Sequence, residues 1–160
     1  MATANSNLSV YDPSEVPSGS DYTIALVVSE WNSQVTEPLF KGAYDTLIKH
    51  GVLISNISRT NVPGSFELIY GAKHAQNTGV DAVVVIGSVI QGETKHFDFV
   101  CQGVVQGIKD LNIKFDIPVI FCVLTDNNLQ QALDRCGGKH GNKGVEAAVA
   151  ALKMASLSKQ

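Results

Sequence analysis

Residues 87–98 contain the residue types that anion binding and proton transfer require. This segment follows the continuous apolar run 82–86, which is typical of a buried strand, and it leads into a pattern typical of a helix. Free backbone N–H groups at a helix start, with Gly92 and the hydroxyl of Thr94 beside them, can bind an anion. His96 follows two residues later and can transfer protons near neutral pH. The segment therefore predicts chemistry on a small phosphorylated molecule.

A nucleotide-binding P-loop is the main alternative for such a glycine-bounded turn. That motif needs a lysine and then a serine or threonine directly after its second glycine. Here Gly92 is followed by Glu93, whose carboxylate would repel a triphosphate, and Lys95 comes too late. The sequence also lacks the Gly-x-Gly-x-x-Gly pattern of nicotinamide-binding folds. Nucleotide hydrolysis and nicotinamide chemistry are therefore disfavoured, and no cofactor is expected.

The composition is that of one ordinary globular domain. The chain has 160 residues, of which 44% are hydrophobic and 17% charged, with a net charge of −3. A low share of charge in a small domain leaves apolar surface for subunit contacts. No basic patch is present, so nucleic acid is not an expected partner. Because no apolar signal segment or membrane-spanning run appears, we expect no membrane association and a cytoplasmic location.

The cysteines and histidines give no metal-binding pattern. Cys101, Cys122 and Cys136 form no Cys-x-x-Cys pair, which suggests free thiols in a reducing compartment. None of the four histidines occurs in a His-x-His or His-Glu-x-x-His spacing, and Cys136 and His140 lack further nearby ligands. No metal site is expected.

Strands and helices alternate over residues 22–160, which we interpret as one domain preceded by an N-terminal arm, 1–21. The strands are expected at 23–28, 52–60, 82–86 and 118–124, and the helices at 36–50, 66–76, 95–111, 129–135 and 142–156. Uniformly apolar strands joined by helices predict an α/β, three-layer, flavodoxin-like domain. It should contain a four-stranded parallel sheet with helices on both faces, and the more polar strand at 52–60 should be an edge.

The N-terminal arm has two interpretations. Residues 1–21 are rich in Ser, Asn, Asp and Pro, which is typical of a disordered tail. Alternatively, residues 8–10 add a strand to a sheet edge, including that of a neighbouring subunit.

Polar and aromatic residues gather where the predicted strands end. In doubly wound sheets the ligand site lies at the carboxyl ends of the strands. The candidates there are Trp31 and Asn32, residues 62–67, residues 87–96, and Thr125 with Asp126.

Each of these residues also has a purely structural interpretation. Trp31 can stack on a planar heterocycle or can be a packing residue. Ser65 is a plausible helix N-cap, and Glu67 can accept from a substrate or complement the helix dipole. His96 alone would read as a solvated histidine. Arg135 can bind a phosphate or can be a cation at a helix C-terminus.

The motifs taken together resemble the lumazine synthase family. Those that carry the resemblance are Trp31-Asn32, the Val-Pro-Gly-Ser-Phe-Glu run at 62–67, the run at 87–98, and Gly-Lys-x-Gly-Asn-Lys-Gly at 138–144. They occur in the family's order and cover about residues 22–156. The resemblance implies condensation of 5-amino-6-(D-ribitylamino)uracil with 3,4-dihydroxy-2-butanone 4-phosphate. The products are 6,7-dimethyl-8-ribityllumazine, phosphate and water, in the penultimate step of riboflavin biosynthesis, without cofactor or metal.

The resemblance also implies roles for individual residues. His96 would shuttle protons. The pyrimidine and ribityl groups would contact Trp31, Asn32, Ser65, Phe66, Glu67, Ser88, Val89, Ile90, Phe121 and Lys143. The phosphate would contact Gly92, Glu93, Thr94 and Arg135. Phe121 and Lys143 match positions that a neighbouring subunit contributes.

Some positions depart from the commoner family pattern. Ser65 and Ser88 stand where alanine is usual, Gln91 where arginine is frequent, and Ile69 where proline often follows Phe-Glu-Leu. The two serines could add hydrogen bonds to a substrate, and Gln91 removes a cation near the expected phosphate.

The family resemblance implies an oligomer with its active site at a subunit interface. Members form pentamers or hollow icosahedral shells of sixty subunits, and shells can enclose riboflavin synthase as cargo. The short 137–144 segment favours the shell. Two other functions remain open: an archaeal-type riboflavin synthase and a non-catalytic flavin-binding or scaffold protein.

Overall fold

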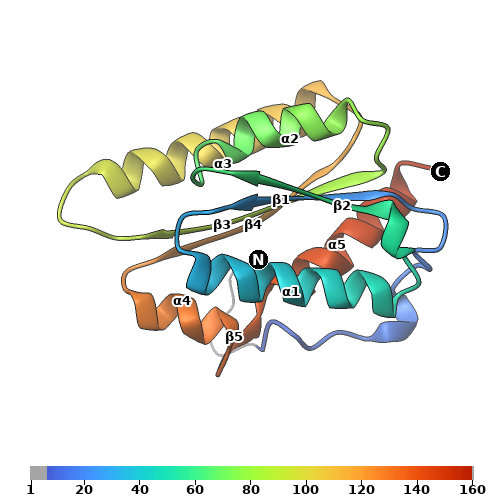
Figure 1. The fold of residues 1–160 in the computed structure, drawn as a ribbon, viewed down its shortest axis with the longest axis horizontal. Helices are drawn as coiled ribbons and strands as arrows, with labels where there is room; N and C mark the ends of the chain where they lie inside the picture. The colour runs from blue at the N-terminus through green and yellow to red at the C-terminus, as the bar shows by residue number, and fades with distance from the viewer. Residues whose placement is uncertain (1–6, 160) are drawn as a thin grey trace.

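The apolar strands form one parallel sheet in the computed structural model, which describes residues 7–159 (Figure 1). Its strands, in spatial order, are β2 (Ile57–Val62), β1 (Ile24–Ser29), β3 (Ala82–Ile90) and β4 (Val119–Asp126). All three neighbouring pairs are parallel. This order confirms the flavodoxin-like layout and places β2 at one edge, as expected. It places β4 at the other edge.

Helices cover both faces of the sheet, which confirms the three layers. One face carries α1 (Ser33–Lys49), α4 (Leu129–Arg135) and α5 (Lys143–Leu157), and the other carries α2 (Leu68–Gln76) and α3 (His96–Lys114) (Figure 1). Successive strand side chains point to opposite faces. Leu26 and Val84 therefore belong to the core under α1 and α5, whereas Val27 and Val85 belong to the core under α2 and α3.

The third strand is longer than the sequence indicated. Residues 87–90 were expected to form a loop, but they continue β3 because β4 supplies a partner as far as the Ile90–Asp126 pair. Gly87 suits this interior position, since a Cβ there would lie 2.8 Å from side-chain atoms of Leu68 and Ser65. The connecting loop is thus confined to residues 91–95.

Two helix starts also differ from the prediction. The first helix begins at Ser33 rather than residue 36, because Asn32 adopts a left-handed conformation (φ 60°) and turns the chain directly out of β1. Pro38 therefore lies inside α1. The second helix begins at Leu68, and its N-cap position is Glu67, without a side-chain capping bond. The expectation that Ser65 caps this helix is wrong, since its hydroxyl has no hydrogen-bond partner.

The remaining boundaries shift by a few residues. The second strand starts at Ile57 after a short 3₁₀ turn, Ile54–Asn56, so residues 52–56 are not strand. The connection before α5, expected as an irregular loop, contains the short antiparallel pair β5 (Cys136–Gly138) and β6 (Gly141–Asn142).

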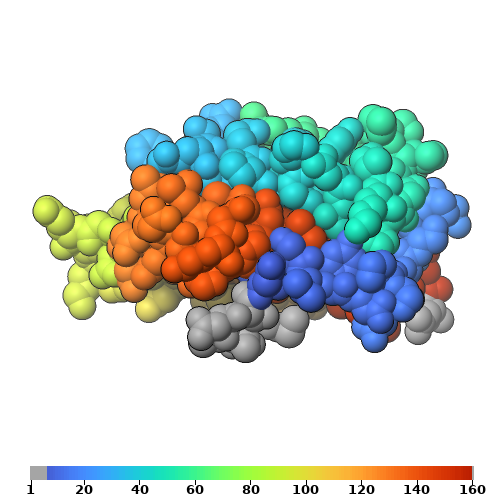
Figure 2. Space-filling model, turned by 90° about the horizontal axis from the view of Figure 1, so that it is seen from below, coloured from blue at the N-terminus to red at the C-terminus, as the bar shows by residue number. Residues whose placement is uncertain are grey.

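The described part of the arm lies across α1 and the 136–142 connection (Figure 2). The Leu8 N–H donates to the carbonyl of His140 at 2.7 Å, and the Tyr11 hydroxyl lies 3.0 Å from His50 Nε2. Residues 8–10 form no strand in this single chain, and a short 3₁₀ turn spans Pro13–Glu15. Residues 1–6 of the predicted arm lie outside the described residues, and its addition to a neighbour's sheet stays a prediction.

Candidate active site

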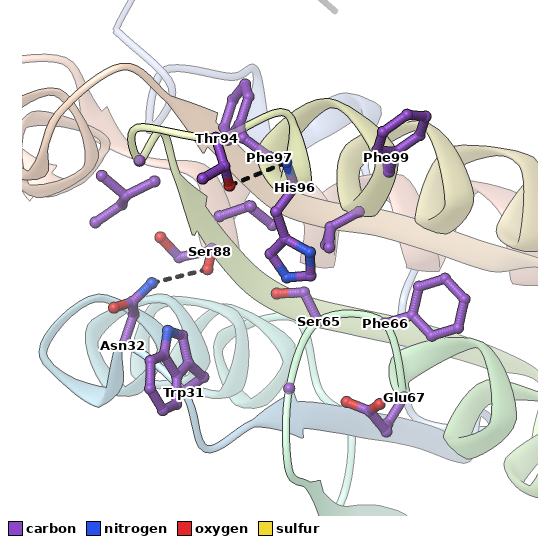
Figure 3. Close-up of a pocket in the computed structure, with 15 residues that line it drawn as sticks. Trp31, Asn32, Ser65, Phe66, Glu67, Ser88, Thr94, His96, Phe97 and Phe99 are labelled. Atoms are coloured by element: carbon purple, nitrogen blue, oxygen red, sulfur yellow. Dashed lines mark hydrogen bonds between the residues drawn. The ribbon is translucent and has the colours of Figure 1, made fainter.

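An open cavity of about 870 Å³ lies at the carboxyl ends of β1, β2 and β3, on the side of α2 and α3 (Figure 3). Three segments far apart in sequence contribute to it: the exit of β1, the exit of β2, and the continuous stretch from the end of β3 into the first turns of α3. The lining residues are Trp31, Asn32, Gly64, Ser65, Phe66, Glu67, Ser88, Val89, Ile90, Gly92, Thr94, His96, Phe97, Phe99 and Val100. Every predicted site residue is among them except Glu93, Phe121, Arg135 and Lys143.

The exit of β1 is a fixed corner. Asn32 has the only positive φ of a non-glycine residue among those described, and its Nδ2 donates to the backbone carbonyl of Ser88 at 3.0 Å. Asparagine tolerates the left-handed region better than most residues do. This bond joins the ends of β1 and β3, and Trp31, immediately before the corner, is 71% exposed at the edge of the cavity.

Two hydroxyl groups in the cavity wall have no partner. Ser65 and Ser88 are 7% and 1% exposed, and neither Oγ makes a hydrogen bond in the described structure. Both oxygens are buried behind the cavity surface, so a ligand that bonds to either one requires rotation of the serine side chain. Such a bond would recover the roughly 1–3 kcal/mol that an unsatisfied buried hydroxyl costs. Figure 3 shows the His96 ring pointing from the start of α3 toward the side of the cavity that carries Ser65.

The loop before α3 provides the features of an anion site. Gly92 and Thr94 line the cavity, and no atom lies within 4 Å of the position that a Cβ on Gly92 would occupy. The Thr94 hydroxyl accepts from the His96 N–H at 3.4 Å, which fixes the turn that begins the helix. The free amides of the first turn of α3 are therefore available beside an exposed imidazole. The arrangement can hold an anion next to a proton carrier.

Comparisons with known proteins agree with this geometry. The family model of 6,7-dimethyl-8-ribityllumazine synthase matches residues 21–159. A protein of Christiangramia forsetii with that description is 63% identical, over 99% of this chain and 96% of its own length. Similar proteins of Flavobacterium johnsoniae and Porphyromonas gingivalis, with the same description, are 64% and 56% identical over 100% and 99% of this chain and 85% and 99% of their own lengths. The chain belongs to the 6,7-dimethyl-8-ribityllumazine synthase family.

For a lumazine synthase, the position of Arg135 in a single chain is notable. It was expected to share the phosphate site with Thr94, yet it lies at the end of α4, on the opposite face of the sheet from α3. Its Nη1 donates to the carbonyl of Gln131 at 2.8 Å and lies 3.8 Å from Asp126 Oδ1. One chain alone therefore does not bring the guanidinium into the cavity.

Three other predicted residues also lie outside the cavity. Phe121 is half-buried on the edge strand β4, and Lys143 opens α5, where its Nζ lies 2.7 Å from Glu146 Oε1. Glu93 is an exposed residue of the 91–95 loop. Phe121 and Lys143 were the positions assigned to a neighbouring subunit, and their absence from the cavity agrees with that assignment without testing it.

Sequence reasoning missed three lining residues of α3, Phe97, Phe99 and Val100, whereas Gly64 lay within the predicted rim segment 62–67. Phe97 and Val100 share the apolar face of α3 with Val104, Ile108 and Leu111, a pattern typical of a buried helix face. Only Val104, Ile108 and Leu111 are buried, because the first turns of α3 extend beyond the helix-covered part of the sheet. Phe99, which is 69% exposed and lies off the apolar stripe, was the available signal.

Residues 7–159 contain neither a metal-binding cluster nor a membrane-spanning helix. No three His, Cys, Asp or Glu side chains there are grouped so that they could hold a metal ion. No helix in that part of the chain is both long and apolar enough to span a membrane.

Proposed function

We propose that this chain condenses 5-amino-6-(D-ribitylamino)uracil with 3,4-dihydroxy-2-butanone 4-phosphate. The products are 6,7-dimethyl-8-ribityllumazine, inorganic phosphate and water, as in the penultimate step of riboflavin biosynthesis. The family membership and the cavity support the same function. The observation that carries the proposal is that an indole, two unpartnered hydroxyls, an anion loop and an imidazole meet in one cavity.

The reaction needs positioning and proton transfer more than a strong nucleophile. The amine of one substrate attacks the ketone of the other, and an imine forms with loss of water. Elimination of phosphate leaves an enol that becomes a second carbonyl. The ribitylamino nitrogen attacks this carbonyl, and loss of a second water closes the ring. Holding both substrates together lowers the entropic barrier, and His96 carries protons at the addition, elimination and closure steps. Thr94 and the first amides of α3 bind the phosphate as it leaves.

The pyrimidine and its side chain occupy the other end of the cavity in this proposal. Trp31 stacks on the flat heterocycle, and the backbone groups of Val89 and Ile90 bond to its polar edge. Ser65, Phe66 and Glu67 contact the ribityl chain, whose hydroxyls are suitable partners for the Ser65 Oγ and the Glu67 carboxylate. Ser88 supplies a second hydroxyl, and Asn32 maintains the corner beneath it.

The direct test is to mix the two substrates with the protein and follow lumazine fluorescence. We expect turnover by the unmodified chain, and an approximately hundredfold or greater loss of kcat for His96→Ala, the range for one acid–base group. His74→Ala is the matched control, because His74 is an exposed histidine on α2 that does not line the cavity. No product from the unmodified chain, or normal kcat in His96→Ala, would contradict the proposal.

We further propose that the cavity is completed by a neighbouring subunit in a pentamer, with Phe121, Arg135 and Lys143 coming from that neighbour. Large apolar side chains are exposed along α3, with Phe99 69%, Val105 48% and Ile113 73% accessible. Such a surface is typical of a subunit contact. Twelve pentamers would form an icosahedral shell able to enclose a riboflavin synthase, and the enzyme would work in the cytoplasm.

Mixed assemblies test the shared site. Chains carrying His96→Ala and chains carrying Arg135→Ala are each expected to have low activity. When the two are co-expressed in equal amounts, about a quarter of the sites should receive an intact histidine from one chain and an intact arginine from its neighbour. Recovery of about a quarter of the normal activity is the expected result. If no activity returns, both residues act within one chain. Light scattering on the same samples gives the number of subunits.

A further inference from the structure

The last residue of β4, Asp126, is a buried carboxylate beside Arg135. Its residue exposure is 6%, and its Oδ2 has no hydrogen-bond partner in the described structure. Its Oδ1 lies 3.8 Å from Arg135 Nη1. Burial raises the pKa of this carboxyl group, and the positive charge of Arg135 opposes that rise. Because a buried carboxylate is costly without a compensating charge, the guanidinium of Arg135 stabilises the ionised form of Asp126.

The guanidinium of Arg135 is held from one side only. Its Nη1 donates to the Gln131 carbonyl at 2.8 Å, within the same helix, and the Asp126 carboxylate lies next to the same nitrogen. A guanidinium has five N–H donors in a planar fork, so donors remain for a second anion. The side chain is 36% exposed, which leaves it accessible. Two neighbours therefore set its direction, and several donors stay free.

The backbone of Asp126 connects this pair to the anion loop. Asp126 is paired with Ile90 of β3, and its carbonyl accepts from the Gln91 N–H at 2.9 Å, where the loop begins. The same residue thus fixes the start of the loop through its main chain and faces Arg135 through its side chain. Nothing in the sequence pattern of the site had indicated a role for it beyond its place on the rim.

We propose that Asp126 is a positioning residue that orients the Arg135 guanidinium toward the phosphate of the substrate. The inference rests on the proposed function, in which Arg135 binds that phosphate in the cavity of the neighbouring subunit. The carboxylate itself does not contact the substrate. It restricts the rotamers of the arginine, so less conformational entropy is lost when the phosphate binds.

The variant Asp126→Asn tests this, since it keeps the shape of the side chain and removes its charge. We expect KM for 3,4-dihydroxy-2-butanone 4-phosphate to rise by about threefold to tenfold, the range for one partly exposed ionic contact. KM for the pyrimidine substrate should stay unchanged. Asp134→Asn is the matched control, because Asp134 precedes Arg135 on the same helix but pairs with Lys139 at 3.3 Å. It should leave both KM values unchanged.

A double-mutant cycle separates positioning from a general structural effect. In the Arg135→Ala background, Asp126→Asn should add nothing to KM for the phosphorylated substrate, because Asp126 has lost the group through which it acts. An equal increase in both backgrounds would overturn the proposal. An equal rise in KM for both substrates in Asp126→Asn would also overturn it. A lower KM for the phosphorylated substrate in Asp126→Asn would overturn it too, because the carboxylate would then compete with phosphate for Arg135.

The same double-mutant cycle can be measured through ligand binding, without following the enzymatic reaction. Inorganic phosphate binding to the assembled protein, measured by calorimetry for the same four variants, should show the same pattern. If the unmodified chain makes no lumazine, the proposed function fails, and the phosphate affinities still decide whether Asp126 acts through Arg135. If turnover is normal and the cycle shows no coupling, only the positioning role fails.

Discussion

The two edges of the sheet differ in kind. The edge strand β2 is polar and exposed over residues 58–61. Its Arg59 donates two hydrogen bonds, of 3.0 and 2.5 Å, to the carboxylate of Glu37 on α1. The guanidinium of Arg59 also lies over the Phe40 ring. By contrast, β4 has no charged residue before Asp126, and Ile120 and Phe121 are half-buried. Charged edge strands resist pairing with other chains, whereas apolar edges favour cover. The sheet therefore has one edge suited to solvent and one suited to a partner.

The largest expected difference between the two edge strands is in the chemical reactivity of a thiol, and it concerns Cys122 of β4, which is buried in the core under α1 and α5. Burial raises the pKa of the Cys122 thiol to about 12, so only about one part in ten thousand is ionised at pH 8. We expect a thiol reagent to modify Cys122 at least about a thousandfold more slowly in the folded protein than in urea. Mass spectrometry of peptides after timed labelling measures this for each cysteine.

The variant Ser58→Cys provides the comparison on the other edge. Ser58 is exposed on β2, so a cysteine there should react at close to the rate of a free thiol. Equal rates at residues 58 and 122 would mean that β4 opens as readily as an unprotected edge.

A charge introduced at Phe121, a half-buried residue of β4 at the margin of the core under α2 and α3, should disrupt assembly. Phe121→Lys is expected to reduce the particle to smaller species and to lower lumazine synthesis by about a hundredfold, because it places a desolvated cation in the proposed interface. Light scattering and fluorescence measure the two effects. Thr60→Lys, the same substitution type on β2, should change neither. If Phe121→Lys assembles normally, β4 is not the covered edge.

The smallest expected effect concerns the ion pair that protects β2. The hydrogen bonds from Arg59 lower the pKa of Glu37 in the folded chain. The ion pair therefore stabilises the fold fully at pH values above the pKa that Glu37 has in the unfolded chain. This contribution is lost as the pH falls through the lower pKa that Glu37 has in the folded chain. Because Glu37 is half-exposed, Glu37→Gln should cost only about 0.5 kcal/mol at pH 7. Below about pH 4.5 the difference from the unmodified protein should shrink. Thermal unfolding between pH 3 and 7 measures it, and a constant difference would contradict the assignment.

The sequence predicted the sheet better than it predicted its ends. Strand interiors such as residues 82–86 and the face of α3 containing Ile108 are set by local apolar patterns, which a single chain displays directly. The end of β3 was predicted wrongly because Gly87 and Ser88 are residue types typical of turns. These residues belong to the strand because β3 pairs with the distant strand β4 as far as Ile90 and Asp126.

The cavity was predictable where the strand ends converge, and the position of Arg135 was not. Trp31, Ser65 and His96 follow from the rule that parallel strands present their carboxyl ends to one rim. Arg135 was expected beside the same phosphate from its guanidinium chemistry and from the family resemblance. The helix that carries it packs on the opposite face of the sheet from α3, and no local pattern encodes that separation.

The left-handed corner at Asn32 has a consequence for how substrate preference can change. A side chain branched at Cβ would strain that backbone, and any replacement other than asparagine would give up the bond to the Ser88 carbonyl. Trp31, beside it, is mostly in solvent and contributes little to the core. Replacing Trp31 with another aromatic residue should therefore cost the fold little, whereas replacing Asn32 should disturb the bend that directs it.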